Sequence, residues 1–356
     1  MMPSLGFLVN PIAGMGGSVG LKGTDGMLEE ALQRGATPVA PGRARTFIGA
    51  LTRQFSFVTC ASPMGHDILH ECGIDAAVAY TPKELTTPAD TRRAVQHMHD
   101  LDLLVFVGGD GTARDILDAI DADVPVLGVP AGVKMYSAVF AQTPRHAARV
   151  VDAYADGLPL EEREVVDIDE ERFRRDELAV SVRGYLLTPV HEAVQPSKGF
   201  GIGTQEAKQA IAHHMAATMD DDVTYVIGGG STTMALKQQL GVEGSLLGVD
   251  VVRDGRLVVR DAMESEIFDA LTSRNAIIVS PLGGHGFLFG RGNEQISPAV
   301  LRRIGLDNIL VISAPEKLTG LQSLKVDTGD ASLDEMLQGY IRVVTGAGEC
   351  RLMPVE

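Results

Sequence analysis

The sequence predicts an α/β protein with a doubly wound parallel-sheet domain followed by a second mixed α/β domain that contains antiparallel strands. Between Leu5 and Ile120, short apolar runs alternate with helical patterns, which is the βαβα order of a parallel sheet covered on both faces. Beyond residue 157, alternating polar and apolar residues are typical of antiparallel strands. Because 156–159 (Asp-Gly-Leu-Pro) is a turn-forming stretch, we expect domains at 1–156 and 157–356.

The composition is that of a globular protein and limits what it can bind. The 356 residues suffice for two domains, and 45% apolar with 22% charged residues is an ordinary globular balance. With 31 basic and 47 acidic residues, the net charge of −16 argues against binding nucleic acid or an anionic membrane. No basic segment precedes an apolar core at the start, and no apolar run reaches the ~20 residues that span a bilayer. We therefore expect a cytoplasmic location.

The chain opens with a predicted strand at 5–9 that runs into a glycine-rich loop at 10–18 (Asn-Pro-Ile-Ala-Gly-Met-Gly-Gly-Ser). Asn10 can bond across to a neighbouring loop, and Gly14 permits close backbone approach. A strand that ends in such a loop is half of a doubly wound nucleotide site. The alternative is a flexible turn. Further elements are predicted as helices at 27–34, 43–54, 66–72 and 91–99 and as strands at 55–60 and 76–80.

The five apolar residues at 103–107 predict a strand buried on both faces, and the sequence Gly-Gly-Asp-Gly-Thr follows at 108–112. Helical spacing then begins, so backbone N–H groups and a helix N-terminus surround one small volume suited to a phosphate. Asp110 would repel a phosphate unless it held a metal ion or took a proton from an attacking hydroxyl. The alternative is an ordinary turn residue.

The 108–112 sequence resembles the signature of the superfamily of NAD kinases, diacylglycerol and sphingosine kinases, and 6-phosphofructokinase. The 10–18 loop is similar to its first motif. The resemblance implies a Rossmann-like domain whose 108–112 loop holds a nucleoside triphosphate. It also implies that Asp110 is the catalytic base, as in NAD kinases, or a magnesium contact, as in phosphofructokinase.

A third motif of the superfamily, a Gly-Thr-Gly-Asn-type turn, is matched in shape by Gly132-Val133-Lys134 after a predicted strand at 124–129. Lys134 is either a counter-charge for a transferred phosphoryl group or a surface lysine. A helix is expected at 143–154. The expected phosphate-binding residues are Asn10, Gly14, Gly108, Gly109, Gly111, Thr112, Gly132 and Lys134.

The second half repeats the order strand, glycine loop and helix. After strands at 161–169 and 177–187 and a helix at 205–219, a strand at 223–227 leads into Gly-Gly-Gly-Ser-Thr-Thr and a helix at 234–240. This loop either binds an anion or a ribose, or only caps the helix. Asp250, within a strand predicted at 245–252, is a site residue or a strand-end residue, because a buried acid needs a partner.

Further strands are predicted at 276–280, 309–312 and 324–328, with a loop or short helix at 316–321 and a helix at 333–340. An edge strand or a return to the first domain is expected at 340–345. The polar loop at 281–298 is a further candidate for substrate contacts. The expected acceptor-site residues are Gly229, Gly230, Ser231, Thr232, Thr233, Asp250, Gly283, Gly284, Arg291 and Asn293.

The second half resembles the branch of predicted ATP-NAD kinases related to AcoX, a protein encoded beside acetoin-breakdown genes. The resemblance implies a Mg²⁺-dependent kinase that transfers a phosphoryl group from ATP, or from polyphosphate, to the 2′-hydroxyl of NAD. The Asn-Glu pair of well-studied NAD kinases is not obvious in this sequence, and their Thr-Ala-Tyr-type loop is missing. Another small hydroxyl compound, or a non-catalytic nucleotide sensor of a catabolic pathway, therefore stays open. The expected partners are small nucleotides, and a homo-oligomer is left open.

Overall fold

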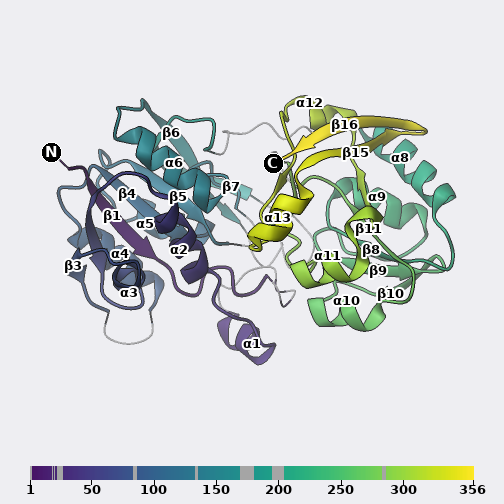
Figure 1. Ribbon diagram of the computed structural model, residues 1–356, viewed down its shortest axis with the longest axis horizontal. Helices are drawn as coiled ribbons and strands as arrows, with labels where there is room; N and C mark the ends of the chain where they lie inside the picture. Colours follow the sequence, from purple (N-terminus) through teal and green to yellow (C-terminus); the bar gives the residue numbers. More distant parts are fainter. Residues whose placement is uncertain are drawn as a thin grey trace. The chain divides into compact units, whose positions relative to one another are not determined.

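A computed structural model of the chain describes residues 2–17, 19, 21, 27–82, 86–132, 135–168, 180–194, 204–282 and 286–356. Its contacts divide the chain into two compact units (Figure 1). Unit 1 comprises residues 1–16 and 22–197, and unit 2 comprises residues 17–21 and 198–356. Each unit is built around its own sheet.

Unit 1 contains a five-stranded sheet in the order β3-β2-β1-β4-β5, and every strand pair in it is parallel. The strands are β1 (Ser4–Val9), β2 (Ser56–Cys60), β3 (Ala76–Tyr80), β4 (Leu103–Gly108) and β5 (Val126–Pro130). The predicted doubly wound parallel sheet is confirmed. β4 lies between β1 and β5 and is buried along its whole length.

Helices cover both faces of this sheet. On one face, α2 (Ala40–Ala50) and α6 (Pro144–Tyr154) bury Phe47 and Val150 in a cluster with Phe7. On the other face, α4 (Pro88–His97) and α5 (Asp110–Leu117) bury Val95 and Ile116 in a cluster with Phe106. Two six-residue helices, α1 (Leu28–Gln33) and α3 (His66–Glu71), complete the described helices of unit 1. Successive side chains of the strands therefore point into two apolar cores, one on each face of the sheet.

An antiparallel hairpin of β6 (Leu160–Ile168) and β7 (Val180–Pro189) follows α6. The two strands were expected from their alternating pattern, and they pair as antiparallel partners. Their contacts are with α5 and β5, so the hairpin belongs to unit 1.

Unit 2 contains a seven-stranded mixed sheet in the order β10-β9-β8-β11-β13-β15-β16. β8 (Thr224–Ile227), β11 (Asn275–Val279), β13 (Ile309–Ile312) and β15 (Gly339–Gly346) are parallel to one another. β9 (Asp250–Arg253), β10 (Arg256–Val259) and β16 (Glu349–Val355) pair in antiparallel fashion. The mixed second domain with antiparallel strands is confirmed.

Two sequence predictions in unit 2 are wrong in detail. The strand predicted at 245–252 begins only at Asp250, because the preceding residues turn around the Asp250 carboxylate. The edge strand predicted at 340–345 is β15, which is an inner strand, since β16 pairs along its outer side. The sequence predicts no strand at 349–355, where the first four residues of β16 are exposed and show no alternation of buried and exposed positions.

The helices of unit 2 also lie on both faces of their sheet. α8 (Gln205–Thr218) and α9 (Ser231–Gln239) share one apolar cluster with Ile227 and Ile278. α10 (Glu264–Ala270) and α11 (Pro298–Ile304) share the other with Ile277 and Val279. The smaller elements are β12 (Phe287–Phe289), α12 (Pro315–Thr319), β14 (Lys325–Val326) and α13 (Ala331–Leu337).

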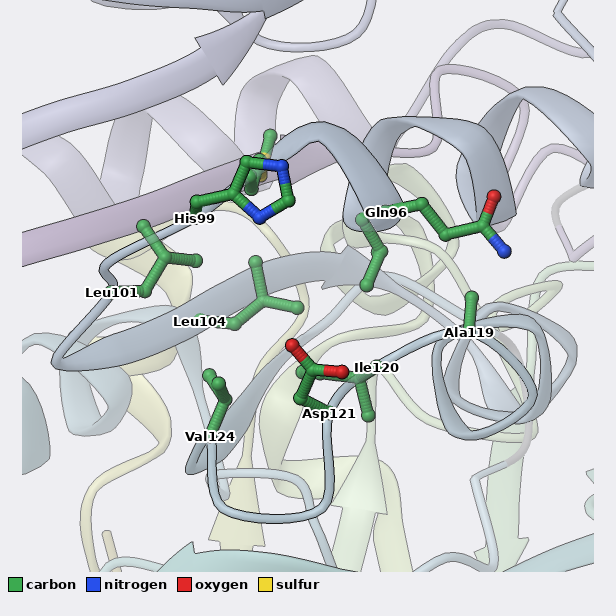
Figure 2. Close-up of a pocket in the computed structure, with 10 residues that line it drawn as sticks. Gln96, His99, Leu101, Leu104, Ala119, Ile120, Asp121 and Val124 are labelled. Carbon is green, nitrogen blue, oxygen red and sulfur yellow. The ribbon is translucent and has the colours of Figure 1, made fainter.

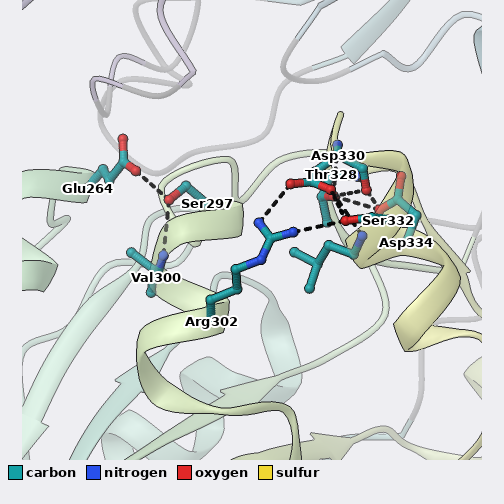
Figure 3. Close-up of polar contacts among 9 residues, drawn as sticks. Glu264, Ser297, Val300, Arg302, Thr328, Asp330, Ser332 and Asp334 are labelled. Atoms are coloured by element: carbon teal, nitrogen blue, oxygen red, sulfur yellow. Dashed lines mark hydrogen bonds and ion pairs between the residues drawn. The ribbon is translucent and has the colours of Figure 1, made fainter.

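Helix caps tie α11 and α13 together (Figure 3). The Ser297 hydroxyl accepts a hydrogen bond from Val300 N at the start of α11 and donates one to Glu264. Asp330 caps α13 by accepting from Leu333 N at 3.0 Å, and it forms an ion pair with Arg302 of α11 at 2.7 Å. The Arg302 guanidinium holds the pKa of the Asp330 carboxyl well below its usual range.

An ion pair with no exposed surface lies under the start of β9. Lys237 Nζ of α9 contacts Asp250 Oδ2 at 2.7 Å, and both side chains are fully buried. The Asp250 carboxylate also accepts hydrogen bonds from Ser245 N at 2.7 Å and Asp261 N at 2.8 Å. Since a buried charge is tolerated only when paired and hydrogen-bonded, this pair holds the 244–250 segment against α9.

Removing one partner of this pair should destabilise the protein strongly. We expect Lys237→Met to lower the free energy of unfolding by about 3–5 kcal/mol, because it leaves the buried Asp250 carboxylate without a positive partner. Arg53→Met, which removes the exposed ion pair with Asp156, should cost no more than about 1 kcal/mol. Denaturant unfolding of both variants and of Lys237→Met/Asp250→Asn measures this. Equal losses of unfolding free energy in Lys237→Met and Arg53→Met would contradict the assignment. Lys237→Met/Asp250→Asn should lose less than the sum of the losses caused by Lys237→Met and Asp250→Asn separately.

Gly14 brings the loop after β1 against the loop after β5. Its φ is +81°, and a Cβ atom there would lie 1.9 Å from the carbonyl oxygen of Ala131. Gly35 has nearly the same backbone conformation, with φ +84°, but apart from its chain neighbours no atom of the described residues lies within 4 Å of its ideal Cβ position. The two glycines therefore separate backbone strain from steric collision.

Gly35→Ala should cost about 1–2 kcal/mol for the left-handed conformation alone. Gly14→Ala should lose that amount and about 1–3 kcal/mol more, because the new methyl group must push the Ala131 carbonyl aside. Thermal or denaturant unfolding of both variants checks the difference. If Gly14→Ala were as stable as Gly35→Ala, the two loops would not be in contact in solution.

Candidate functional site

The carboxyl ends of β1 and β4 form a topological switch point. The chain leaves β1 towards β2 on one side of the sheet and leaves β4 towards β5 on the other. The helices that follow these strands, α2 and α5, lie on opposite faces. In doubly wound sheets this divergence opens a crevice where ligands bind. The predicted phosphate loops at 10–18 and 108–112 begin at these two strand ends.

Asn10 links the two loops. Its backbone N–H donates to Val107 O at 2.9 Å, and its side-chain Nδ2 donates to Thr112 Oγ1 at 2.9 Å. Its Oδ1 accepts from Ile12 N at 3.3 Å, which closes the turn after β1. Thr112 is buried, so its hydroxyl supports the loop from beneath. This is the bond to a neighbouring loop that the sequence predicts for Asn10.

Glycines let three strand ends meet. Ala131 N donates to Gly108 O at 3.0 Å, which extends the pairing of β4 and β5 into their loops. A Cβ atom on Gly132 would lie 3.0 Å from the Cα of Gly109, and one on Gly108 would lie 2.5 Å from Thr112 Oγ1. Side chains at these positions would force the loops apart. Gly111 lies in the first turn of α5, where the backbone N–H groups lack helical partners and favour an anion.

Asp110, the first residue of α5, is the titratable group of this edge. Its Oδ2 accepts from Tyr136 N at 2.8 Å and its Oδ1 accepts from Ser137 N at 2.9 Å. Burial raises the pKa of the Asp110 carboxyl to about 6, although hydrogen bonds from Ser137 and Tyr136 and the charge of Arg114 act in the opposite direction. A carboxylate with a pKa near neutrality is well placed to exchange a proton.

The amides of Tyr136 and Ser137 are site contributions that sequence reasoning missed. The analysis of the 132–141 segment rested on the charge of Lys134, whereas the structure uses two backbone N–H groups a little further on. Backbone donors have no signature in residue letters, so no signal in the sequence could have identified them. Lys134 itself lies outside the described residues, as do Gly283 and Gly284.

The described acceptor-site candidates belong to unit 2. Gly229 and Gly230 form the turn into α9, Ser231 is exposed at its start, and Thr232 is buried behind it. Thr233 is buried and donates to Gly230 O at 2.9 Å. Asp250 is the buried partner of Lys237 described above. That these residues contact an acceptor stays a prediction.

Two further candidates shape the loop after β12. The Arg291 guanidinium lies over the ring of Phe287, 4.4 Å from its centroid. Asn293 Nδ2 donates to Leu288 O at 2.7 Å, and only 1% of its surface is exposed. Both side chains therefore support the fold of the loop, and any contact with an acceptor stays a prediction.

A cavity of about 140 Å³ lies in unit 1 between the ends of α4 and α5 (Figure 2). Apolar side chains, Leu104 and Val124 among them, line most of it, and its polar groups are Gln96, His99 and Asp121. Because Leu104 is at the start of β4 and Asp110 follows its end, the cavity is at the opposite edge of the sheet from Asp110. It has no part in the candidate site.

Among the residues that the structure describes, no three His, Cys, Asp or Glu side chains gather as a metal site. Asp110 is the carboxylate at the switch point that could bind a cation. Within the same described ranges, no helix combines the length and hydropathy needed to cross a membrane.

Two family models match the chain. The ATP-NAD kinase N-terminal domain matches residues 5–158, and the ATP-NAD kinase C-terminal domain matches residues 220–355. No curated protein matches it. The first match contains the loops after β1, β4 and β5 that meet around Asp110. With both domain models matched over most of its length, the chain belongs to the ATP-NAD kinase family, a family of enzymes.

Proposed function

We propose that the chain transfers a phosphoryl group from ATP to the 2′-hydroxyl of NAD and so makes NADP. The observation that carries the proposal is the Asp110 carboxylate, which has a raised pKa and lies at the switch point where the loops after β1, β4 and β5 meet. Membership of the ATP-NAD kinase family supports these substrates.

In this proposal Asp110 is the general base. The acceptor oxygen forms a bond to the γ-phosphorus while the bond from that phosphorus to the β,γ-bridging oxygen breaks. The hydroxyl proton passes to an Asp110 carboxylate oxygen, and ADP leaves with the bridging oxygen. The N–H groups of Gly109, Gly111 and Thr112 at the start of α5 would hold phosphate oxygens. Positioning and charge neutralisation supply most of the catalysis of such transfers.

Mg²⁺ fits this site as a companion of the nucleotide. The Asp110 carboxylate accepts backbone hydrogen bonds from Tyr136 and Ser137 and a side-chain hydrogen bond from Ser137, which leaves one of its four lone pairs for a cation. Mg²⁺ is commonly bound through one or two carboxylates together with substrate phosphates, so one carboxylate suffices. When bound, the ion would neutralise phosphate charge. Asp110 as base and Asp110 as metal contact remain the two roles to separate.

The finer features are part of the proposal. Polyphosphate as donor, another small hydroxyl compound as acceptor, and placement in the AcoX-related branch rest on the sequence resemblance. The restriction to small nucleotide partners also rests on it, whereas the cytoplasmic location rests on the composition and on the apolar runs of the sequence. A non-catalytic nucleotide sensor is the second candidate, and it is favoured by the good fit of the loops to phosphate regardless of any turnover.

Asp110→Asn should abolish NADP formation while leaving ATP binding within a few-fold of the parent. The amide keeps the shape of the carboxylate but cannot take a proton at neutral pH, so we expect turnover to fall by at least about 10²-fold. NADP is measured with NAD, Mg²⁺ and either ATP or polyphosphate. Asp118→Asn is the matched control, because it changes an exposed carboxylate at the other end of the same helix.

Two results would overturn parts of this proposal. NADP formation by Asp110→Asn at the parental rate would overturn the role of Asp110 as base, although the protein would still be a kinase. Binding of ATP by the parent protein without transfer from either donor to NAD or to other hydroxyl compounds would overturn the kinase proposal and support the sensor.

The pH dependence tests whether Asp110 acts in its ionised form, as a base must. As a base with a pKa of about 6, Asp110 must be ionised, so kcat/KM should be level above that pH and fall about tenfold for each unit below it. The measurement is a pH profile from acid to alkaline conditions, with circular dichroism at each pH to show that the fold persists. A profile that stays level well below the pKa of Asp110 would argue that Asp110 is not the base.

A further inference from the structure

Unit 2 has a switch point of its own. β8 and β11 are adjacent parallel strands, and the connections that follow them diverge. α9, after β8, buries Leu236 on one face of the sheet, whereas α11, after β11, buries Leu301 on the other. The carboxyl ends of β8 and β11 therefore flank the kind of crevice that binds ligands in doubly wound sheets.

The turn from β8 into α9 brings backbone N–H groups to this crevice. Gly230 N donates to Leu246 O at 2.7 Å, and a Cβ atom on Gly229 would lie 2.7 Å from Leu247 O, so the turn is tightly fitted. The first helical bond of α9 is from Met234 N to Gly230 O, which leaves the N–H groups of Ser231, Thr232 and Thr233 without helical carbonyls. Such a nine-residue helix favours an anion at its start.

Ser280 is a second, independent observation at the same place. Its exposed fraction is 1%, and its hydroxyl has no hydrogen-bond partner among the residues that the structure describes. Ala276 and Ile278 of β11 pack in the cluster beneath α9, so strand alternation places Ser280 on that same face. A Cβ atom on Gly230 would lie 4.0 Å from the Cβ of Ser280. An unpaired buried hydroxyl beside a helix N-terminus is a donor that lacks an acceptor.

Two lysines add positive charge at this edge of the sheet. Lys208 lies in the first turn of α8, which packs beside α9 and leads into the start of β8, so that turn is near the strand carboxyl ends. Lys317 lies in α12, shortly after the carboxyl end of β13. Lys208 is 7% exposed, and within the described ranges neither ammonium has an ion pair or hydrogen bond. Burial and the charge of Lys208 lower the pKa of Lys317 to about 8.

The nearby carboxylate Asp250 does not compensate these lysines, because Lys237 already pairs with it. Two like charges that are packed together and desolvated are unfavourable, and an anion between them relieves both costs. The chain has a net charge of −16, so a local surplus of positive charge is an exception that calls for a ligand.

We infer that unit 2 binds a phosphate group at the carboxyl edge of β8, β11 and β13, held by the start of α9, Ser280, Lys208 and Lys317. The ligand is a small molecule that carries a phosphate or a diphosphate. Assigning that phosphate to a substrate of the kinase rests on the proposed function, whereas the binding site itself does not.

The test follows the chemistry of Lys317. Its lowered pKa makes the free amine reactive, and a bound anion should raise the pKa and slow acylation at least about tenfold. The full chain is labelled with an amine-acylating reagent in saturating inorganic pyrophosphate or in NaCl of equal ionic strength. Peptide mass spectrometry then gives the rate at Lys317, with Lys325 of β14 as the internal control.

Ser280→Ala provides the matched variant, because it removes only the unpartnered hydroxyl. It should raise the pyrophosphate concentration needed for half-protection of Lys317 by about tenfold. Asp110→Asn should leave protection unchanged even if turnover is lost, so failure of this inference can be told from failure of the proposed function. ATP and NAD replace pyrophosphate in parallel, and the more potent protector identifies the source of the phosphate.

Equal acylation of Lys317 in NaCl and in all three phosphate compounds would overturn the inference. So would protection that Ser280→Ala leaves unchanged. Arg303→Gln, which removes an exposed positive charge from α11, controls for the overall charge and should leave protection as it is.

Discussion

Burial of β4 on both faces is the constraint on which unit 1 depends. A strand with no exposed side chain needs a strand on each side and helices above and below, and β1, β5 and the two apolar clusters satisfy that need. The connection that leaves β1 leads to β2 on one side and the connection that leaves β4 leads to β5 on the other, so the two diverge at their carboxyl ends. Gly108, Gly109 and Asp110 occupy that point, so the packing that stabilises the sheet also places the chemistry.

The Asp110 carboxylate shows how the fold tunes a catalytic group. Burial opposes its ionisation, while the Ser137 side chain, the backbone N–H groups of Tyr136 and Ser137 and the charge of Arg114 favour it, and the balance leaves the pKa at about 6. A carboxylate that is too well solvated would be a weak base, and one that is too poorly solvated would stay protonated at neutral pH. The contacts with Tyr136 and Ser137 therefore matter as much as the acid itself.

Unit 2 deals with buried charge in two ways. At Lys237 and Asp250 the opposite charges neutralise each other without any exposed surface, and the pair orders the loop before β9. At Lys208 and Lys317 two like charges act on each other at the carboxyl edge of the sheet, and the hydroxyl of Ser280, after a strand of the same sheet, has no partner among the described residues. The first arrangement is complete within the protein, whereas the second is completed by an anion. This difference separates a structural cluster from a binding site.

Local sequence was sufficient for the features that depend on hydrophobic periodicity and on glycine. The parallel sheet of unit 1, the loops after β1 and β4, and the likeness of 108–112 to kinases of the NAD kinase superfamily followed from short stretches of residues. These features are readable because apolar runs and glycine turns are determined by neighbours in the chain.

Only the tertiary structure decided which groups meet. Asp250 looked like a site residue from sequence, because a buried acid needs a partner, but that partner is Lys237, which the fold brings across from α9. The edge strand β16 was missed because its first four residues are all exposed and lack the alternation by which a half-buried strand is predicted. Strand order and long-range packing bring the amides of Tyr136 and Ser137 to Asp110. They also place Ser280 next to the start of α9. Residue letters do not encode such contacts, whereas the sequence by itself determined the sheet, its glycine loops and the acid at their centre.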